Sequence, residues 1–281
     1  MKKYAVFTMD VEDFSDIYCL RGKSKEAFPS MMDGVGVYLD LLEKYHIKGD
    51  LFVLANRLDK DREILKNAVE RGHRIAVHGF SHELPSNETK EEFADHIAKA
   101  KMLIEESLSV HVQGFRAPGF SLRQDEVDIL PQLGFRYDAS EQDYKIGTYG
   151  ANLDTSSFVE IRESILNREG FYEIKMPKSI IHPLKGLPIG GGAYCRIPPY
   201  SFVKKAVKTT IGKKSLYAFY CHPFEVSKVR IPRVGFLSPL NCIYLHRRKN
   251  YLKKIEDIIK ILIEEGYEFV TYEELIDSIS A

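Results

Sequence analysis

Two histidines and a group of carboxylates in this sequence could together bind a metal ion. His78 and His82 stand four residues apart, so they can share one metal if the segment makes a helical turn. Asp10, Glu12 and Asp13 lie within four residues of one another. Two imidazoles and one carboxylate, with coordination positions left open, form the ligand set of catalytic zinc and of non-haem iron sites. The histidine spacing alone is weak evidence, since two-residue motifs also occur by chance.

The carboxylates follow a stretch that predicts a buried strand. Residues 4–9 carry no charge and are rich in β-branched and aromatic side chains, as in a parallel strand that is covered on both faces. In α/β barrels and open parallel sheets, active sites lie at the C-terminal ends of the strands. The acids are therefore functional candidates, although an acidic turn after a strand explains this stretch equally well when it is taken alone.

Five predicted strands end in polar side chains, and this repetition favours a shared site. The ends of parallel strands in a closed or nearly closed barrel lie on one rim. One such residue would more often be a polar group in an ordinary loop, but five strand ends favour a common function. The residues concerned are the acids that begin at Asp10, and then His78, Arg116, Asp138 and His222.

Apolar residues alternate between strand and helix spacing along the chain, with a repeat of about thirty residues that is typical of stacked βαβ units. Thr89 with Glu92, and Thr271 with Glu274, have the spacing of capping boxes at helix starts. Further strands are predicted at 51–54, 74–77, 112–115, 135–137, 216–221 and 267–270. Helices are predicted at 35–45, 61–71, 89–108, 123–133, 199–210 and 250–265, with a closing helix from 271.

The alternation lapses between residues 140 and 200. Short β-like pieces at 158–161 and 171–175 are followed by a run rich in glycine and proline at 187–194. The run lacks the Gly-Lys-Ser/Thr ending of a phosphate loop and no clear helix follows it, so it predicts a turn or a close approach of the backbone to a ligand. No linker or change in composition divides the chain, which predicts a single domain over 1–281 with an elaborated segment at about 140–200.

The composition excludes several classes of function. Forty basic and forty acidic residues give a formal charge of zero, which argues against nucleic acid or an anionic membrane as a partner. No apolar run is long enough to span a bilayer, and the one at the N-terminus is too short for a signal peptide, so we expect a cytoplasmic protein without stable membrane insertion. The cysteines contain no Cys-x-x-Cys pair and favour free thiols. They are Cys19, Cys195, Cys221 and Cys242.

The order of these motifs resembles that of the polysaccharide deacetylase superfamily, which is NodB-type and similar to carbohydrate esterase family 4. The resemblance covers nearly the whole chain. The glycine-rich run, together with residues 197–200 and 219–225, is similar to the branch associated with exopolysaccharide and surface-glycan biosynthesis. The matching motifs are Asp10-Val11-Glu12-Asp13, His78-x-x-x-His82, Arg116-Ala117-Pro118-Gly119-Phe120, Asp138 and Tyr220-Cys221-His222-Pro223.

The resemblance implies an α/β fold, a distorted (β/α) barrel of about seven parallel strands. The activity it implies is the removal of N-acetyl groups from amino sugars with a divalent metal, for which Zn²⁺ is expected first and Co²⁺, Mn²⁺ or Ni²⁺ are alternatives. By position, Asp10 matches the general base, Arg116 its partner and His222 the general acid. Asp138 matches a motif that orients the catalytic machinery, and a backbone N–H near Phe120 would hold the oxyanion.

The metal ligands implied by the resemblance are His78, His82 and a carboxylate, and the sequence departs from the family at the carboxylate. In the wider family the ligand directly follows the base, whereas here Val11 occupies that place. The third ligand must then be Glu12, Asp13 or absent. Strand alternation puts Glu12 on the same side as the base, while a turn or bulge after the strand would bring in Asp13.

Three functions are compatible with the sequence. The leading hypothesis is a metal-dependent hydrolase that deacetylates a polysaccharide, an oligosaccharide or a glycan precursor. The second is a metal-independent hydrolase of cyclic amides that resembles allantoinase. The third is a carbohydrate-binding pseudoenzyme that has kept the fold but has lost turnover because Val11 replaces a ligand.

Overall fold

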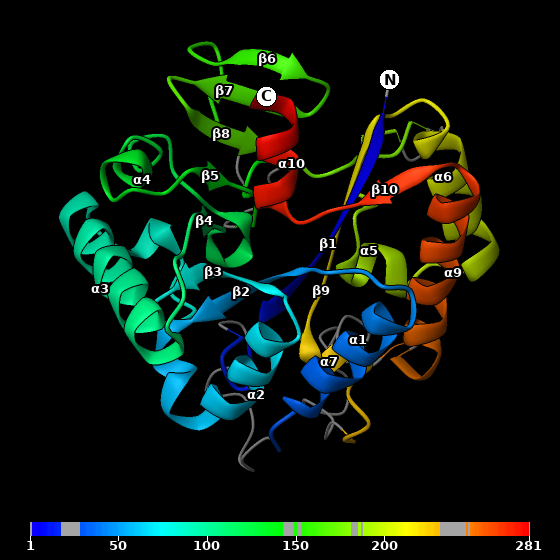
Figure 1. Cartoon of the computed structure of the whole chain (residues 1–281), viewed down its shortest axis with the longest axis horizontal. Helices are drawn as coiled ribbons and strands as arrows, with labels where there is room; N and C mark the ends of the chain where they lie inside the picture. Colours follow the sequence, from blue (N-terminus) through cyan, green and yellow to red (C-terminus); the bar gives the residue numbers. More distant parts are fainter. Residues whose placement is uncertain are drawn as a thin grey trace.

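The computed structural model describes residues 2–17, 29–142, 149–150, 153–180, 185–186, 188–230, 246 and 248–280. Cys19 and Cys242 lie outside these residues. In the described part of the chain, ten strands form one curled sheet, and helices lie around it (Figure 1).

Strand β1 (Lys3–Val11) lies at the centre of the sheet. It pairs along one edge with β9 (Leu216–Cys221), beside which it runs through the middle of Figure 1. The other edge is shared, because β10 (Tyr267–Phe269) pairs near the start of β1 and β2 (Asp50–Leu54) pairs near its end. All three pairings are parallel, and every residue of β1 after Lys3 is buried. The strand predicted at 4–9 is therefore confirmed and is longer than expected.

From β2 the sheet continues through four more parallel strands. These are β3 (Arg74–Gly79), β4 (Gly114–Phe115), β5 (Tyr137–Asp138) and β8 (Phe171–Ile174). Among the described strands, eight therefore run parallel to their neighbours. This arrangement confirms the predicted distorted barrel of about seven parallel strands.

An antiparallel hairpin extends the sheet beyond β8. It consists of β7 (Ile165–Arg168), which pairs with β8, and β6 (Val159–Arg162), which forms the edge. The turn between β7 and β8 has positive φ angles at Glu169 (51°) and Gly170 (90°). Positive φ at both central residues is typical of a type I′ turn, which usually has Asn or Asp before the glycine. The unusual Glu explains why β7 was not predicted.

Successive side chains of β1 enter two different apolar layers. Ala5, Phe7, Met9 and Val11 belong to the main core cluster, between the sheet and the surrounding helices. Tyr4 and Val6 belong to the second cluster, inside the curl of the sheet. Because side chains alternate along a strand, Thr8 and Asp10 continue the inner series. The strand therefore carries Asp10 to the inner face of the barrel.

The longer helices form an outer layer around much of the sheet (Figure 1). The capping box at Thr89 is present, and Thr271 and Glu274 exchange backbone-to-side-chain hydrogen bonds of 2.8 and 3.3 Å, so both predicted boxes are confirmed. No helix in the described ranges is long and apolar enough to cross a membrane. The helices are α1 (Asp33–Lys44), α2 (Leu58–Glu70), α3 (Lys90–Leu108), α6 (Tyr200–Ile211), α9 (Tyr251–Glu264) and α10 (Tyr272–Ser280).

Two short helices differ from what the sequence predicts. The helix predicted at 123–133 is wrong in extent, since only α4 (Ile129–Gln132) forms. Pro131 has no N–H to donate back to the preceding turn, so the helix cannot extend toward its N-terminus. Conversely, α5 (Gly192–Arg196) begins inside the glycine-rich run, where no helix was expected.

The glycine-rich run closely approaches strand β9. Gly191 forms a parallel bridge with Tyr220 of β9, and the Tyr220 N–H donates to the Gly190 carbonyl at 2.7 Å. A Cβ atom on Gly191 would lie 1.8 Å from the Tyr220 carbonyl oxygen. Only glycine fits this contact, which fixes the start of α5 against β9.

Candidate active site

A cavity of about 880 Å³ lies at the C-terminal ends of the parallel strands. Its lining includes Asp10, Glu12, His78, His82 and His222, which follow or end β1, β3 and β9. These side chains come from segments more than two hundred residues apart in the chain, and the curl of the sheet brings their strands to one rim. The convergence predicted from the strand ends is therefore present for these five residues.

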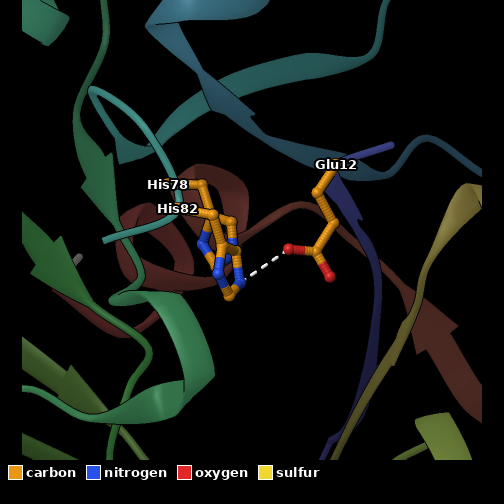
Figure 2. A group of neighbouring side chains, drawn as sticks. All are labelled: Glu12, His78 and His82. Carbon is orange, nitrogen blue, oxygen red and sulfur yellow. Dashed lines mark ion pairs between the residues drawn. The ribbon is translucent and has the colours of Figure 1, made fainter. Parts of the chain in front are cut away.

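Glu12, His78 and His82 form a buried cluster with the composition of a metal site. Their ligand atoms all lie within 4.8 Å of one another. Figure 2 shows the two imidazoles side by side, with the Glu12 carboxylate opposite them. His82 Nε2 and Glu12 Oε2 are 2.6 Å apart. Among the described residues, this is the cluster of three potential ligands that could hold a metal ion.

The hydrogen bonds of the three side chains leave ligand atoms available for a metal ion. His78 Nδ1 lies 2.9 Å from the Arg116 carbonyl oxygen. A carbonyl only accepts, so His78 donates from Nδ1 and its Nε2 is available as a ligand, which is the usual arrangement of metal-binding histidines. His82 Nδ1 is a buried polar atom without a hydrogen-bond partner among the described residues, and Glu12 Oε2 has only its 2.6 Å ion-pair contact with His82. Buried polar atoms are rarely left unpaired, and a cation between the three side chains would compensate Glu12.

Burial and neighbouring charges shift the pKa values of the three side chains in the cluster. Burial by itself disfavours the carboxylate of Glu12, but the contact and charge of His82, together with the charges of His222 and His78, outweigh burial and lower the pKa of Glu12 to about 2. Burial likewise disfavours the charged ring of His82, and Glu12 reverses this effect and raises its pKa. For His78, burial dominates and lowers the pKa. Neutral His78 and ionised Glu12 are the protonation states that metal coordination requires.

The structure places Glu12, and not Asp13, in the ligand set. The Glu12 N–H donates to the Asp10 carbonyl at 3.0 Å, so the chain turns tightly after β1 and directs Glu12 to the histidines. Asp13 Oδ1 instead accepts from the backbone N–H groups of Phe14 and Met31, at 2.8 and 2.9 Å. Its Oδ2 accepts from Arg57 at 3.2 Å. Asp13 as a ligand is therefore corrected, because its carboxylate fixes the loop behind the site.

Asp10 is held by a fully buried arginine. Arg116 donates from one terminal nitrogen to Asp10 Oδ1 at 2.7 Å and to the Thr8 hydroxyl at 2.8 Å. The guanidinium lies over the Phe52 ring, 4.0 Å from its centroid, a favourable cation–π contact. Since a buried charge is tolerated only when it is paired, the acid and the arginine stabilise each other. The predicted partnership of these two residues is present.

Asp138 lies behind the cavity rather than in its wall. Its carboxylate accepts from the Ser140 hydroxyl at 2.7 Å and from the Ser140 N–H at 3.0 Å. Ser140 in turn accepts from the Ala117 N–H at 2.8 Å. Burial raises the pKa of Asp138, and burial together with the nearby charge of Asp138 raises the pKa of Glu173 well above its usual range. Asp138 thus supports the backbone beside Arg116 from a distance.

His222 is oriented by a carboxylate that the sequence did not single out. His222 Nδ1 and its backbone N–H both lie 3.1 Å from Glu225 Oε2. His222 Nε2 is 3.5 Å from Glu12 Oε1, so this nitrogen faces the metal cluster. Burial lowers the pKa of His222, but Glu225 outweighs burial and raises it to about 9. The signal in the sequence was the spacing of a capping box, because His222 caps α7 (Pro223–Val226) and Glu225 is its third residue.

The backbone near Phe120, where an oxyanion donor is predicted, borders the cavity. The Phe120 N–H already donates to the Ala117 carbonyl at 2.9 Å, and Phe120 lines the cavity. Gly119 also lines the cavity, and its N–H has no acceptor among the described residues. Gly119 has a positive φ of 60°, a conformation that glycine adopts at little cost.

The far wall of the cavity is formed by the glycine-rich run, α5, α6 and the segment between these helices, which contribute mostly apolar side chains. The sequence motifs single out residues 187–194 and 197–200 but miss Phe202 and Ala206, because apolar residues at helical spacing look like any core face. The residues of this wall are Ile189, Tyr194, Ile197, Pro198, Pro199, Phe202 and Ala206.

The fold and the site define the class of the protein. It is a parallel α/β barrel with a two-histidine, one-carboxylate cluster at the strand ends, flanked by an arginine-paired aspartate and a carboxylate-paired histidine. Two family models match successive parts of the chain. The first, described as polysaccharide deacetylase, matches residues 32–137, and the second, described as a domain of unknown function (DUF3473), matches residues 147–277.

Known proteins agree with this class. The chain is 30% identical over 107 residues to a peptidoglycan deacetylase of Helicobacter pylori, a match that covers 38% of this chain and 36% of that protein. Its fold is similar to a candidate polysaccharide deacetylase from Mycobacterium smegmatis (TM-score 0.63, 14% identity, 99% of this chain and 91% of that chain). It is also similar to an allantoinase (TM-score 0.63, 15% identity, 98% and 89%). A part of the chain, residues 32–137, thus matches the polysaccharide deacetylase family.

Proposed function

We propose that this protein is a metal-dependent hydrolase that removes N-acetyl groups from amino sugars of a glycan or glycan precursor. The observation that carries the proposal is the placement of Asp10 and His222 in one cavity with the cluster of Glu12, His78 and His82. The similarity to a peptidoglycan deacetylase supports an acetylated glycan as the substrate class.

The proposed cofactor is a divalent metal, with Zn²⁺ the best fit to one carboxylate and two imidazole ligands. Glu12, His82 and the Nε2 atom of His78 would hold it. When bound, such a metal polarises a carbonyl oxygen and makes a water molecule more acidic. Co²⁺, Mn²⁺ and Ni²⁺ accept the same ligands and are the alternatives.

The side chains around the cluster supply the acid–base chemistry. Asp10, which is paired with Arg116, would take a proton from the attacking water. The backbone N–H of Gly119 would donate a hydrogen bond to the oxygen that becomes negative. His222, which is protonated near neutral pH because its pKa is raised to about 9, would give its Nε2 proton to the departing amine.

Aromatic side chains in the cavity could contact the sugar ring. Phe120, Tyr194 and Phe224 line it, and aromatic faces pack well against apolar surfaces. The match of residues 147–277 to a separate family model is compatible with the branch associated with exopolysaccharide and surface-glycan biosynthesis. We include that branch in the proposal as the source of the glycan.

Acetate release from N-acetylglucosamine oligosaccharides, measured together with metal content, tests this function. Protein purified without chelator should contain about one equivalent of metal and release acetate. The His82→Ala variant should lose both the bound metal and the release of acetate. Activity that survives complete removal of metal would favour a metal-independent amide hydrolase. Metal-loaded wild type that binds these oligosaccharides but releases no more acetate than Asp10→Asn would favour a binding protein without turnover.

A further inference from the structure

The general acid of the proposed reaction is fixed by a buried network. His222 donates to Glu225 Oε2 through both its ring and its backbone. Its ring also stacks on Phe224, with centroids 5.2 Å apart, and meets the edge of Tyr220 at 5.6 Å. These contacts limit rotation of the imidazole, so the orientation of Nε2 depends on where Glu225 lies.

Glu225 is held in turn by Arg196. The Nε of Arg196 donates to Glu225 Oε1 at 2.7 Å, and both residues are 1% exposed. A planar guanidinium that is always charged keeps Glu225 ionised and therefore able only to accept hydrogen bonds. With Glu225 as acceptor, His222 must carry a proton on Nδ1. The tautomer and the direction of Nε2 are thereby determined together.

Helix α9 anchors the arginine. Lys254 is 5% exposed and donates to the carbonyl oxygens of Cys195, Arg196 and Pro198, at 3.2, 2.8 and 2.9 Å. These carbonyls end α5, whose start is fixed on β9 by Gly191. Both ends of the short helix are therefore attached to the body of the protein.

Asp138 does not perform this task. Both oxygens of its carboxylate accept hydrogen bonds from Ser140. It is also absent from the described lining of the cavity, whereas Arg196 and Glu225 are present there. The carboxylate that orients the acid thus comes from the C-terminal part of the chain.

We propose that Arg196 and Glu225 act as a positioning pair, which holds His222 with Nδ1–H on Glu225 and Nε2 toward the nitrogen that leaves. The proposal rests on the proposed function. As the C–N bond of the tetrahedral intermediate breaks, its electron pair goes to nitrogen, which takes the Nε2 proton, and acetate and the free amine result. A displaced His222 slows this step most when the leaving group cannot depart without a proton.

Two substrates that differ in leaving group test the pair. Glu225→Gln should lower kcat for N-acetylglucosamine oligosaccharides by about 100-fold with little change in KM. Hydrolysis of 4-nitrophenyl acetate should stay near the wild-type rate, because nitrophenolate leaves without a proton. Arg196→Met should likewise slow deacetylation but not the hydrolysis of 4-nitrophenyl acetate. Arg196→Lys should have a deacetylation rate between those of Arg196→Met and wild type. The double variant with Glu225→Gln and His222→Ala should have the same kcat as His222→Ala alone, since both residues affect the transfer of the same proton.

Metal content and a matched control separate positioning from structural damage. All variants should keep wild-type zinc content. Asp61→Asn breaks another buried ion pair, the 2.6 Å contact with Arg57, and should leave both rates unchanged. If Glu225→Gln deacetylates at the wild-type rate, or loses both reactions equally, the positioning role is wrong.

A measurement without turnover keeps this inference separate from the proposed function. In ¹H–¹⁵N spectra of zinc-free protein, the Nδ1–H of His222 should appear as a downfield signal that is absent from His222→Ala and from Glu225→Gln. If wild type releases no acetate but shows this signal, the proposed function fails and the pairing stands. If wild type lacks the signal, or if Glu225→Gln keeps it, the pairing is wrong.

Discussion

On one side of the cavity the polar side chains stand at the ends of parallel strands, and on the other they are carried by the short helices α5 and α7. Asp10 and Glu12 end β1 and His78 lies in β3, where backbone pairing fixes their positions. His222 and Glu225 belong to α7, and Arg196 ends α5. The first family model covers the histidine ligands and the second covers the helical side.

The difference lies in what holds each side in place. On the strand side, a sheet with a buried core on both faces sets the backbone, so a changed side chain should alter chemistry more than shape. On the helical side, buried ion pairs hold short helices, and such pairs are stable only while both partners are present. Variants of the strand side should therefore remove function locally, whereas variants of the helical side should also disturb neighbouring groups.

The largest effect is expected at Asp10. Asp10→Asn keeps an acceptor for Arg116 but cannot take a proton, so kcat for acetate release should fall by about 10²- to 10⁴-fold. Metal content and the unfolding midpoint should stay close to wild type, and both are measured beside the rate. A wild-type kcat in this variant would show that another group is the base.

Adjacent carboxylates on the strand side should behave in opposite ways. Glu12→Gln should lower zinc affinity at least about 100-fold, the upper range for changes outside the ligand set. Asp13→Asn should keep zinc affinity but lose about 1–3 kcal/mol of stability, because the buried Arg57 loses a charged partner. Competition with a zinc-binding dye and urea unfolding measure the two quantities. The reverse pattern would make Asp13 the ligand.

The helical side should give the metal-free protein a pH-dependent stability. The folded pKa of His222 is raised from 6.5 to about 9, so its contribution is complete below pH 6.5 and is lost as pH rises toward 9. The free energy of unfolding should fall across this range by up to about 3 kcal/mol. His222→Gln is the control and should show a flatter profile. Equal slopes for both proteins would mean that His222 is not stabilised as a cation.

The smallest effect is expected at the anchor of α5. Lys254→Met removes the donor to three carbonyl oxygens and should lower kcat for acetate release about 10-fold, as outer-shell changes do. Zinc affinity should be unchanged, since the strand side is independent of α9. Lys253→Met, at the exposed neighbouring position, is the matched control. A loss of zinc affinity in the Lys254 variant would show that the two sides are coupled.

Much of the strand side could be predicted from sequence. An uncharged strand that ends in acids, and later strands that end at His78 and Arg116, share one rim in any parallel barrel. The helical side was predicted only at His222, which also ends a strand. Arg196 and Glu225 were missed because their pairing joins α5 to α7, and no periodic pattern records a contact between two short helices. The hairpin strand β7 depends on one unusual turn, and the short extent of α4 depends on one proline. Neither effect appears in a periodic pattern of apolar residues.

The sequence by itself determined the alternation of strands and helices, the barrel class and the residues at the strand ends. These follow from local periodicity and from the geometry common to all parallel sheets. Only the tertiary structure placed Glu12 rather than Asp13 beside the histidines, left the Gly119 N–H without an acceptor among the described residues and put Glu225 next to His222. Each of these choices depends on which way one carboxylate or N–H group points after a turn. That direction is set by hydrogen-bond partners that come from distant parts of the chain.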